Sequence, residues 1–474
     1  MEREVAWKKY DEAASAEGEA LAADYINFIS DNKTERECAA AAIAAAEDAG
    51  YDSLADCIAA GTPVGPGSKL WACAQGKAVV HVGAAPISEG MNILGAHIDS
   101  PRLDIKQNPL YEANDFALLD THYYGGIKNY QWTALPLALH GVVATTDGEV
   151  IEVNIGDDPA DPVFCVTDLL PHLGAQQMDK KGAKVVEGED LDVLVGNRPL
   201  LSTADSSDSK EAESTETPKD PVKAHVLALL ADKYGISEED FLSAELEVVP
   251  AGRARDLGFD RSMVIGYGQD DRVCAYTSLV AQLALGDDVP ARTAVCVLVD
   301  KEEIGSVGAS GMASMFFENT IAEIMALAGE SSPLRLRRAL TRSRMLSSDV
   351  SAGFDPAYAS VFEAKNSAYL GRGLVFNKYT GSRGKSGSND ASAEYVALVR
   401  RIMDDAGVSF QTAELGRVDA GGGGTIAYIP AKYGMDVIDS GVPVLSMHSP
   451  WEVTSKADIY EARRGYEAFL RAEG

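Results

Sequence analysis

The first part of this chain has the pattern of polar and apolar positions that is typical of helices. Residues 12–60 are expected to be helical throughout. Thr34 followed by Glu37 forms a capping-box pattern ahead of an alanine-rich run, and Gly50 stands where that helix should end. The pattern therefore predicts helices at the amino-terminal end, one of which starts just after Thr34.

Strand-like and helical segments alternate over most of the remaining chain. Buried strands are predicted at Ala78–Val82, Met91–His97, Met263–Tyr267, Thr293–Val299, Arg344–Ser348 and Val442–Met447. An amphipathic helix is predicted at Asp271–Leu285, and a helix-rich segment at about 309–340. Strands that alternate with helices predict an α/β fold, in which a mostly parallel mixed sheet is flanked by helices.

One long interval has a different pattern. Between about 105 and 250 the chain shows short strand candidates, glycine-rich turns and few long helical periods. A chain of 474 residues exceeds the usual size of one hydrophobic core, so an inserted domain is expected. Within this interval, 202–221 is almost free of apolar residues and is predicted to be a solvated loop. The predicted parts are a catalytic domain from 1–104 and 251–474, with a β-rich domain inserted at 105–250.

The composition narrows the class of protein. A formal net charge of −30 argues against nucleic acid and anionic membranes as partners, because both require clustered Lys and Arg. The amino terminus shows no secretory signal, and no apolar run is long enough to span a bilayer. The cysteines form no C-x-x-C pair and are interpreted as buried thiols in a reducing compartment. The sequence therefore predicts a cytoplasmic protein.

Residues of metal-ligand type follow several predicted strands. In a doubly wound sheet, ligand sites form just beyond the carboxyl ends of the strands. One His or Asp at such a position is usually a structural polar residue. Here five positions coincide: His97 with Asp99, Asp270 with Asp271, Glu302 with Glu303, Asp349, and His448. Two imidazoles and several carboxylates together are typical of a paired divalent-metal centre.

The chemistry of such a centre explains these residue types. Two cations about 3.5–4 Å apart need a shared carboxylate, and a further carboxylate must accept the proton of the attacking water. The neighbours Glu302 and Glu303 suit this division, because one can bind metal while the other handles the proton. Asp99 is suited to orienting His97 through its other ring nitrogen.

Five runs of this sequence resemble the aspartyl aminopeptidase family of metallopeptidases, most closely its bacterial branch. They are GAHIDSPRLDIKQNPLYE, GYGQDDRVCAYTSL, VDKEEIGSVGASG, SSDVSAGFDPAY and MHSPWEVTSKAD. The resemblance extends from about residue 20 to the carboxyl end, apart from the polar segment at 202–221. It implies a two-metal exopeptidase fold and the removal of N-terminal residues from peptides.

The resemblance also implies roles for individual residues. The metal ligands would be Asp271 as the bridge, His97 and Asp349 on one ion, and Glu303 and His448 on the other. Asp271 is preferred to Asp270 because the family's aspartate occupies the second position of this pair. Glu302 would be the general base and Asp99 the partner of His97. Two divalent ions are implied, with Zn²⁺ preferred and Mn²⁺ or Co²⁺ as alternatives.

Four further residues are candidates for binding substrate. His172 matches a family histidine in the inserted domain, although a His between leucines is more often a core or interface residue. Lys378 lies in a stretch without acidic residues, 364–389, and its charge would recognise an N-terminal Asp or Glu. Gly423 and Thr425 belong to a glycine run that lets backbone groups approach a substrate, unless the run is simply a flexible turn.

The sequence thus predicts a metalloaminopeptidase that prefers Asp or Glu at the N-terminus of its substrate. Neutral or broad specificity, a two-metal deacylase, and a mainly self-assembling scaffold remain as alternatives. The family also implies a homo-oligomer, a dodecamer built from dimers that the inserted domain pairs. A basic cluster could meet acidic surface on a neighbouring subunit or could be a solvated helix face: Arg335, Arg337, Arg338, Arg342 and Arg344.

Overall fold

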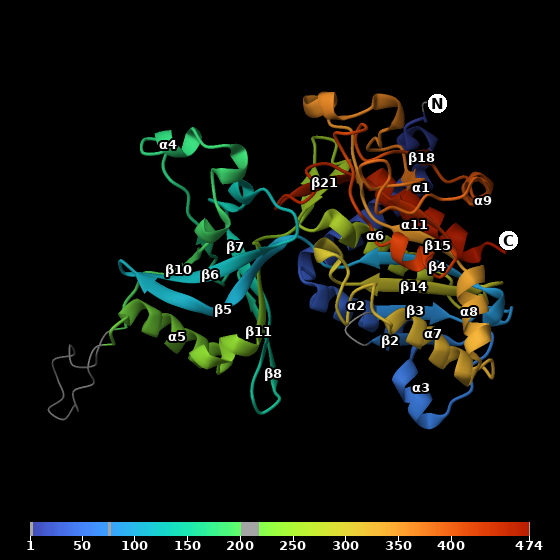
Figure 1. Cartoon of the computed structure of the whole chain (residues 1–474), viewed down its shortest axis with the longest axis horizontal. Helices are drawn as coiled ribbons and strands as arrows, with labels where there is room; N and C mark the ends of the chain where they lie inside the picture. The colour runs from blue at the N-terminus through green and yellow to red at the C-terminus, as the bar shows by residue number, and fades with distance from the viewer. Residues whose placement is uncertain (1–2, 74–76, 201–217, 474) are drawn as a thin grey trace. The chain divides into compact units, whose positions relative to one another are not determined.

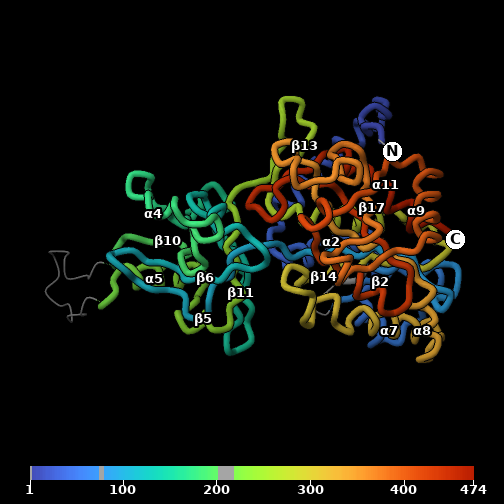
Figure 2. Tube along the Cα trace, turned by 45° about the horizontal axis from the view of Figure 1, so that its top comes forward, coloured from blue at the N-terminus to red at the C-terminus, as the bar shows by residue number. Residues whose placement is uncertain are grey.

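The structure is a computed structural model that describes residues 3–73, 77–200 and 218–473. The chain forms two compact units (Figure 1). Unit 1 comprises residues 1–100 and 253–474, and unit 2 comprises residues 101–252. Unit 1 therefore contains both ends of the chain, which are marked in Figure 2. None of the described helices is long and apolar enough to cross a membrane.

The described part of unit 1 is built on a nine-stranded sheet. Its order is β1-β2-β3-β14-β4-β15-β19-β17-β18. The strands, in chain order, are β1 (Asp52–Ser53), β2 (Lys69–Cys73), β3 (Lys77–His81), β4 (Met91–His97), β14 (Thr293–Val299), β15 (Arg344–Ser348), β17 (Leu374–Asn377), β18 (Phe410–Thr412) and β19 (Asp436–Gly441). The central strands β14, β4, β15 and β19 are mutually parallel, while β3 and β17 join them antiparallel. The predicted mostly parallel mixed sheet is confirmed.

Helices cover both faces of this sheet, as Figure 1 shows. One hydrophobic core packs against α1 (Glu12–Asp31), α2 (Glu35–Asp48), α6 (Gln269–Leu283), α9 (Ala393–Asp405) and α11 (Lys456–Arg471). The other core packs against α3 (Leu54–Ala60), α7 (Phe316–Leu327), α8 (Pro333–Arg342) and α10 (Tyr428–Ala431). Nearly all residues of the central strands are buried because both faces of the sheet are covered; β14, for example, is buried at every position.

The predicted helix start near Thr34 is present in the structure. The Thr34 hydroxyl accepts a hydrogen bond from the Glu37 N–H at 3.2 Å, and Glu37 Oε2 accepts one from the Thr34 N–H at 2.9 Å. The helix ends at Asp48, and Gly50 takes the left-handed conformation, φ +79°, that glycine favours after a helix. Local capping chemistry therefore fixes both ends of α2.

Two smaller sheets complete unit 1. The first is antiparallel and contains β12 (Arg255–Leu257), β13 (Met263–Gly266) and β21 (Glu452–Ser455). The second pairs β16 (Ser351–Ala352) with β20 (Pro443–Val444). The strand predicted at Val442–Met447 is therefore mostly wrong. The sheet strand of this region is β19, which ends at Gly441, because the chain breaks regular pairing with β15 there.

The described part of unit 2 contains a seven-stranded antiparallel sheet. Its order is β8-β7-β11-β5-β6-β10-β9. The strands are β5 (Arg102–Ala113), β6 (Phe116–Tyr124), β7 (Leu137–Ala144), β8 (Val150–Ile155), β9 (Cys165–Val166), β10 (Val193–Gly196) and β11 (Ala244–Pro250). The short helix α4 (Ala175–Met178) and the longer α5 (Pro221–Tyr234) belong to this unit. Most of the polar segment predicted as a loop at 202–221 lies outside the described residues.

Candidate active site

The carboxyl edge of the central sheet gathers three of the predicted positions. His97 is the last residue of β4, and Asp349 follows β15 directly. Glu302 and Glu303 begin a short 3-10 helix, Glu302–Ile304, just after β14. Because β14, β4 and β15 are parallel neighbours, their carboxyl ends lie at the same edge of the sheet. This topology explains why residues more than two hundred positions apart meet here.

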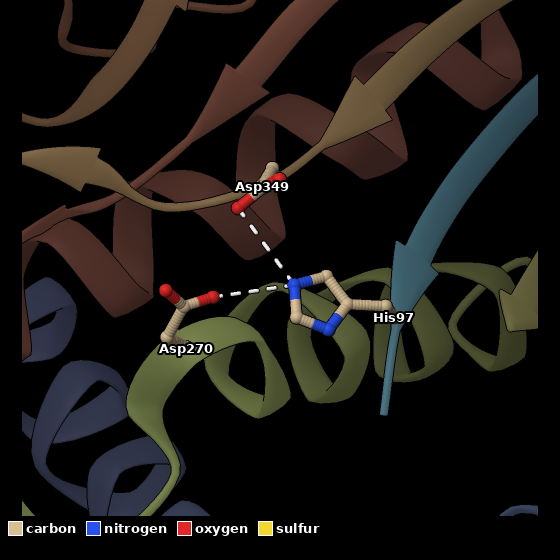
Figure 3. Close-up of side chains that lie close together, drawn as sticks. All are labelled: His97, Asp270 and Asp349. Atoms are coloured by element: carbon tan, nitrogen blue, oxygen red, sulfur yellow. Dashed lines mark ion pairs between the residues drawn. The ribbon is translucent and has the colours of Figure 1, made fainter. Parts of the chain in front are cut away.

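Asp270 and His448 reach the same place from elements outside the large sheet: Asp270 is in the first turn of α6, and His448 lies between β20 and β21. Asp270 lies at the start of α6, and its two carboxylate oxygens each lie 3.2 Å from an imidazole nitrogen, one from His97 Nε2 and one from His448 Nε2. Asp349 Oδ1 lies 3.9 Å from the same His97 nitrogen (Figure 3). Glu303 is 3.5 Å from His448 Nε2. Asp270 is therefore the carboxylate that both imidazoles share.

Asp271 has a different environment from the one its predicted bridging role requires. Its carboxylate is fully buried, and Oδ2 accepts a hydrogen bond from the backbone N–H of His97 at 3.4 Å. It belongs to none of the groups of side chains that could hold a metal among the described residues. Asp270, and not Asp271, therefore lies between the two imidazoles, and the identity of the bridging ligand stays a prediction. The physical reason is that successive side chains at this bend leave the backbone in different directions, and only that of Asp270 lies between the imidazoles.

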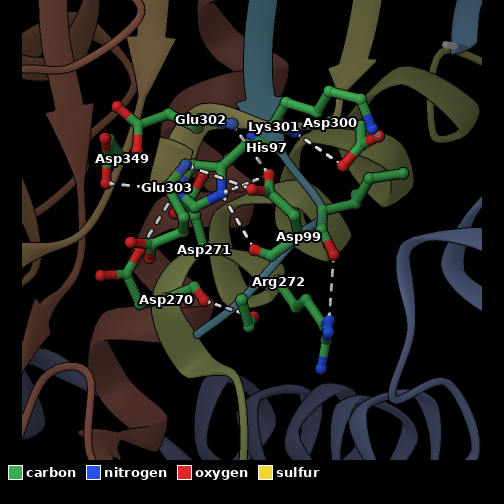
Figure 4. Close-up of polar contacts among 12 residues, drawn as sticks. His97, Asp99, Asp270, Asp271, Arg272, Asp300, Lys301, Glu302, Glu303 and Asp349 are labelled. Atoms are coloured by element: carbon green, nitrogen blue, oxygen red, sulfur yellow. Dashed lines mark hydrogen bonds and ion pairs between the residues drawn. The ribbon is translucent and has the colours of Figure 1, made fainter. Parts of the chain in front are cut away.

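Asp99 links His97 to the loop that carries the two glutamates (Figure 4). Its Oδ1 lies 3.2 Å from His97 Nδ1, the ring nitrogen that faces away from Asp270. The same carboxylate accepts the backbone N–H groups of Glu302 and Glu303 at 3.2 and 3.1 Å. Asp99 is fully buried. One carboxylate therefore positions both an imidazole and the backbone of the glutamates.

A second buried aspartate, Asp300, holds the other side of this loop. It accepts the backbone N–H of Lys301 at 2.6 Å, the ammonium group of Lys301 at 2.7 Å and the hydroxyl of Ser310 at 2.6 Å. Its own N–H donates to the Ser310 carbonyl. Lys301 and Ser306 adopt positive φ values, +68° and +62°, which non-glycine residues keep only when their surroundings impose them. Asp300 therefore helps to fix the turn that presents Glu302 and Glu303.

Glu452, on β21, is a part of this site that the sequence interpretation missed. Its Oε1 accepts the His448 N–H at 2.6 Å and its Oε2 accepts the Asp270 N–H at 3.0 Å. It is buried, and burial raises its pKa to about 8. The available signal was an acidic residue four positions after His448, in a segment already identified as part of the family pattern.

The charges of this cluster are strongly coupled. Burial, reinforced by the negative charge of Asp270, raises the pKa values of Glu303 and Asp349 well above those of ordinary carboxyl groups. Burial also raises the pKa of Glu302. For Asp270, burial acts in the same direction, but the contacts with His448 and His97 outweigh it and hold its pKa well below the usual range. Burial and mutual repulsion therefore disfavour ionisation of Glu302, Glu303 and Asp349.

The donor set suits divalent cations. Three groups have ligand atoms within 4.8 Å of one another: His97, Asp270 and Asp349; Asp270, Glu303 and His448; and His97, Glu302 and Glu303. The first two groups share Asp270. Asp270 Oδ1 and Glu303 Oε1 are buried and accept no hydrogen bond from the described residues, although imidazole nitrogens lie nearby. Imidazole nitrogens and carboxylate oxygens are ligands that Zn²⁺ accepts, so the residues fit a metal centre.

The four candidate substrate-binding residues do not lie together in the structure as the predicted metal ligands do. Lys378 follows β17, which runs antiparallel to β19 and so leads away from the carboxyl edge. Its ammonium group pairs with Asp390, the residue just beyond the predicted acid-free stretch. Thr425 donates its hydroxyl hydrogen bond to the buried Asp439 of β19, and the Gly423 carbonyl accepts the Gly381 N–H at 2.6 Å. His172 is an exposed residue of unit 2.

Fold and site together define a metal-dependent hydrolase. The chain matches the family model described as "Aminopeptidase I zinc metalloprotease (M18)" over residues 28–470, and it belongs to that family. The predicted resemblance is thereby confirmed. The chain is an aminopeptidase that hydrolyses the peptide bond after an N-terminal residue. This activity distinguishes it from the deacylase and the scaffold that the sequence left as alternatives.

Similarity to individual proteins supports the same family assignment. The chain is 57% identical to the "Probable M18 family aminopeptidase 1" of Clostridium acetobutylicum over 467 residues, covering 98% of this chain and 97% of that one. It also matches the crystal structure of aminopeptidase I from C. acetobutylicum, with a TM-score of 0.89, 55% identity and full coverage of both chains. The structure of the S. cerevesiae mApe1 dodecamer matches with a TM-score of 0.74 and 18% identity, covering 95% and 96% of the two chains, which shows a common fold.

Proposed function

We propose that this aminopeptidase uses two divalent cations that share Asp270. The observation that carries the proposal is the position of the Asp270 carboxylate, with one oxygen 3.2 Å from each of the two imidazoles. One cation would be held by His97, Asp270 and Asp349, and the other by Asp270, Glu303 and His448. Zn²⁺ agrees with the family description, and Mn²⁺ or Co²⁺ are alternatives with the same ligand types.

Cations at these positions would resolve the charge imbalance of the cluster. A buried carboxylate is stable as an anion only beside a compensating charge or strong hydrogen-bond donors. Two divalent ions bring four positive charges to a cluster that otherwise raises the pKa of Glu303 and Asp349. When bound, such a pair polarises the scissile carbonyl and makes water a better nucleophile at neutral pH.

Glu302 is our candidate for the general base. It lies near His97 and Glu303 but is not in either group that shares Asp270. Its backbone is held by Asp99, so its carboxylate has a defined position. Glu302 would take a proton from the attacking water and deliver it to the leaving amine, so that the peptide bond is replaced by a carboxylic acid and a free amine. Asp99 and Glu452 would keep the imidazoles and Asp270 in place.

Paired variants of the two adjacent aspartates test this arrangement. Asp270→Asn weakens the shared ligand, so we expect it to bind fewer than two metal ions per chain and to lose activity. Asp271→Asn is the matched control, because it is buried beside the same helix start but accepts only a backbone N–H and a neighbouring thiol. It should keep two ions. Metal content measured by mass spectrometry, together with turnover of an aminoacyl reporter, separates them. The reverse result would return the bridge to Asp271.

A preference for acidic N-terminal residues is part of the proposal. Such a preference requires a cation in the substrate pocket, because the surface of a chain with charge −30 repels acidic peptides. Lys378 and Lys385 share one carboxylate, Asp390, which leaves a net positive charge after β17. His172, Gly423 and Thr425 remain the other candidates for substrate contacts. A panel of reporters with Asp, Glu, Leu and Lys at the N-terminus measures the preference, and faster cleavage after leucine would contradict it.

We further propose that the enzyme assembles as a dodecamer from dimers that unit 2 pairs. The described part of unit 2 has strand β8 at one end of its sheet, and an edge strand favours association with another chain, whereas β9 at the other end bridges Thr133. The mApe1 dodecamer is a precedent within the fold. A cytoplasmic location is proposed because all six cysteines are free thiols. Analytical ultracentrifugation measures the assembly, and a monomer at working concentration would contradict it.

A further inference from the structure

Arginine side chains gather at the amino edge of the central sheet. Arg335, Arg338 and Arg342 follow one another on α8 at spacings of three and four residues, so they share one face of that helix. All three are exposed. Arg335 and Arg338 make no hydrogen bond or ion pair with any other residue that the structure describes. The helix ends directly before β15, which places this face beside the start of the parallel strands.

The three side chains line a groove. Its cavity has a volume of about 510 Å³, and its opposite wall is the segment Gly83–Glu89 that leads into β4. The groove is held together by the arginine that lies closest to the strands. Arg342 donates hydrogen bonds to the Ser88 carbonyl at 3.3 Å and to Glu89 Oε1 at 2.9 Å. The groove is therefore formed by two segments that are fixed to each other, and it is not a gap between loose loops.

Acidic groups offset only part of the positive charge here. Glu89 pairs with Arg342, while the Glu330 carboxylate accepts the backbone N–H groups of Ile87 and Ser88 at 2.9 and 3.1 Å. Two more arginines, Arg292 and Arg344, lie at the starts of β14 and β15 and each has a buried nitrogen that donates to no described group. Three guanidinium groups thus line the groove against two carboxylates, while Arg344 of β15 lies opposite Asp436 of β19.

This excess is unusual in a chain that has 72 acidic residues and only 42 basic ones. Like charges three and four residues apart on a helix repel each other and destabilise it. An anion in the groove would remove that repulsion and would form charge-assisted hydrogen bonds with the guanidinium groups. The arrangement therefore costs free energy in the free protein and recovers it when an anion binds.

We propose that this groove binds a small molecule with adjacent phosphate groups, such as a nucleoside triphosphate or inorganic triphosphate. A planar guanidinium donates two parallel hydrogen bonds to phosphate oxygens, and two unpaired guanidiniums on successive helical turns can bind neighbouring phosphates. The volume lies within the range of about 300–1,000 Å³ that is typical of small-molecule sites. An acidic surface of another protein is a poorer match, because a concave groove of this size does not admit a flat surface.

The groove is separate from the metal-ligand cluster. Strand β4 starts at Met91, next to the groove, and ends at His97, so its seven residues separate the two sites by about 20 Å. Substitutions in the groove should therefore leave aminopeptidase turnover unchanged when no phosphate ligand is present. This property gives each variant an internal check of correct folding.

Calorimetric titration of the metal-loaded enzyme with inorganic triphosphate, and separately with ATP, tests the proposal. We expect binding by the wild type and at least tenfold weaker binding by the double variant Arg335→Gln/Arg338→Gln, because both unpaired guanidiniums are lost. Arg337→Gln is the matched control: Arg337 is an exposed arginine of the same helix, but it does not line the groove. It should bind like the wild type. Tighter binding of ATP than of triphosphate would identify a nucleotide as the ligand, and equal binding would identify the phosphate chain alone.

Glu89→Gln provides a test that a folding defect cannot imitate. The substitution lowers the negative charge beside the groove, while the amide oxygen of Gln can still accept the Arg342 hydrogen bond, so binding of both ligands should become several-fold tighter. The proposal is overturned if the wild type binds neither ligand, or if the double variant and Arg337→Gln lose affinity equally. Binding that persists in the double variant would show that the ligands only extract the metal ions. A change of sedimentation in the double variant without ligand would show that the groove is a protein interface.

Discussion

The two edges of the central sheet carry opposite chemistry on the same four strands. At the carboxyl edge, the buried His97 and the partly buried Asp349, Glu302 and Glu303 form a cluster with excess negative charge. At the amino edge, arginines around the starts of β14 and β15 are mostly exposed. Parallel strands place all their starts on one side and all their ends on the other, so each edge collects one kind of group. Burial makes the difference: the exposed arginines are solvated, whereas the buried acids depend on partners.

The backbone differs between the edges as well. At the carboxyl edge, three aspartates and glutamates accept backbone N–H groups and so fix the loops: Asp99, Asp300 and Glu452. At the amino edge the connections are mixed: the Glu330 carboxylate accepts the N–H groups of Ile87 and Ser88, whereas Arg292 and Arg342 donate to backbone carbonyl groups. Rigid presentation of the acids is what catalysis by positioned groups requires. The comparison predicts that substitutions at the carboxyl edge affect activity far more than those at the amino edge.

The largest effect is expected for Glu302→Gln. The variant keeps the size of the side chain and both groups that share Asp270, so it should retain its metal ions. Because proton transfer is lost, turnover should fall by about 10³-fold or more. Steady-state kinetics and metal analysis of the same sample measure the two properties together. Near-normal turnover with normal metal content would rule out Glu302 as the base.

A smaller effect is expected for Asp300→Asn, which acts on the loop and not on the reacting groups. The amide cannot accept all three hydrogen bonds that Asp300 receives, so Glu302 and Glu303 should lose their defined position. We expect metal affinity or turnover to fall by about 10–100-fold, the range for groups that orient metal ligands. The control is Asp288→Asn, which removes an exposed carboxylate paired with Arg471. Equal kinetics of the two variants, measured at saturating metal and after limited chelation, would refute the role.

Lys378→Met should change selectivity more than rate. The lysine is about half exposed and shares Asp390 with Lys385, so its charge is only partly available. An ion pair this exposed contributes about 0–1 kcal/mol, so the ratio of Asp to Leu cleavage should fall by about fivefold at most. Lys385→Met serves as the comparison. If both variants leave the ratio unchanged, acidic preference does not depend on this side chain.

The smallest effect concerns His81, which lies at the amino edge because β3 runs antiparallel to β14 and pairs His81 with Ala294. Burial, assisted by the positive charge of Lys69, lowers the pKa of His81. The folded state therefore binds this proton less well than the unfolded state. The stability that neutral His81 contributes is present above about pH 6.5, the pKa of an unperturbed histidine, and is lost as the pH falls through the lower folded-state value.

His81→Leu should remove this dependence. Both ring nitrogens are buried and have no hydrogen-bond partner among the described residues, so leucine replaces no polar contact. Urea midpoints at pH 7.5 and pH 5.5 should therefore differ less in the variant than in the wild type. The difference between the two proteins isolates His81, since the acidic cluster titrates in both. An identical pH dependence would mean that His81 does not contribute.

The sequence predicted the regular elements well where local rules decide them. Met91–His97, Thr293–Val299 and Arg344–Ser348 are strands with the predicted bounds, and nearly all of their residues are buried because both faces of the sheet are covered. The segment after Gly441 does not follow this simple rule. Its apolar residues are buried, but they cover the sheet edge with a two-residue strand instead of extending β19. Apolar periodicity reports burial, and it does not report which partner strand is available.

The site shows the same limit at the level of single residues. Sequence position identifies Asp270 and Asp271 equally well as candidates, and only the local bend decides which carboxylate lies between His97 and His448. Lys378 lies in a stretch without acidic residues that ends at Asn389, one residue before its ion-pair partner Asp390. Contacts between neighbouring loops depend on their conformation, which residue spacing does not encode. The roles of these residues therefore rest on the variants proposed above.

The division of unit 1 into two chain segments affects the order in which the enzyme can be made. Unit 2 is continuous, so the ribosome completes it while much of unit 1 is still to be synthesised. Asp270 and the glutamates emerge next, whereas His448 and Glu452 follow only after β19. A nascent chain thus lacks one imidazole and the carboxylate that holds it until almost all of the family region has been translated. The peptidase site can therefore be completed only near the end of synthesis, after the whole of unit 2 has been made.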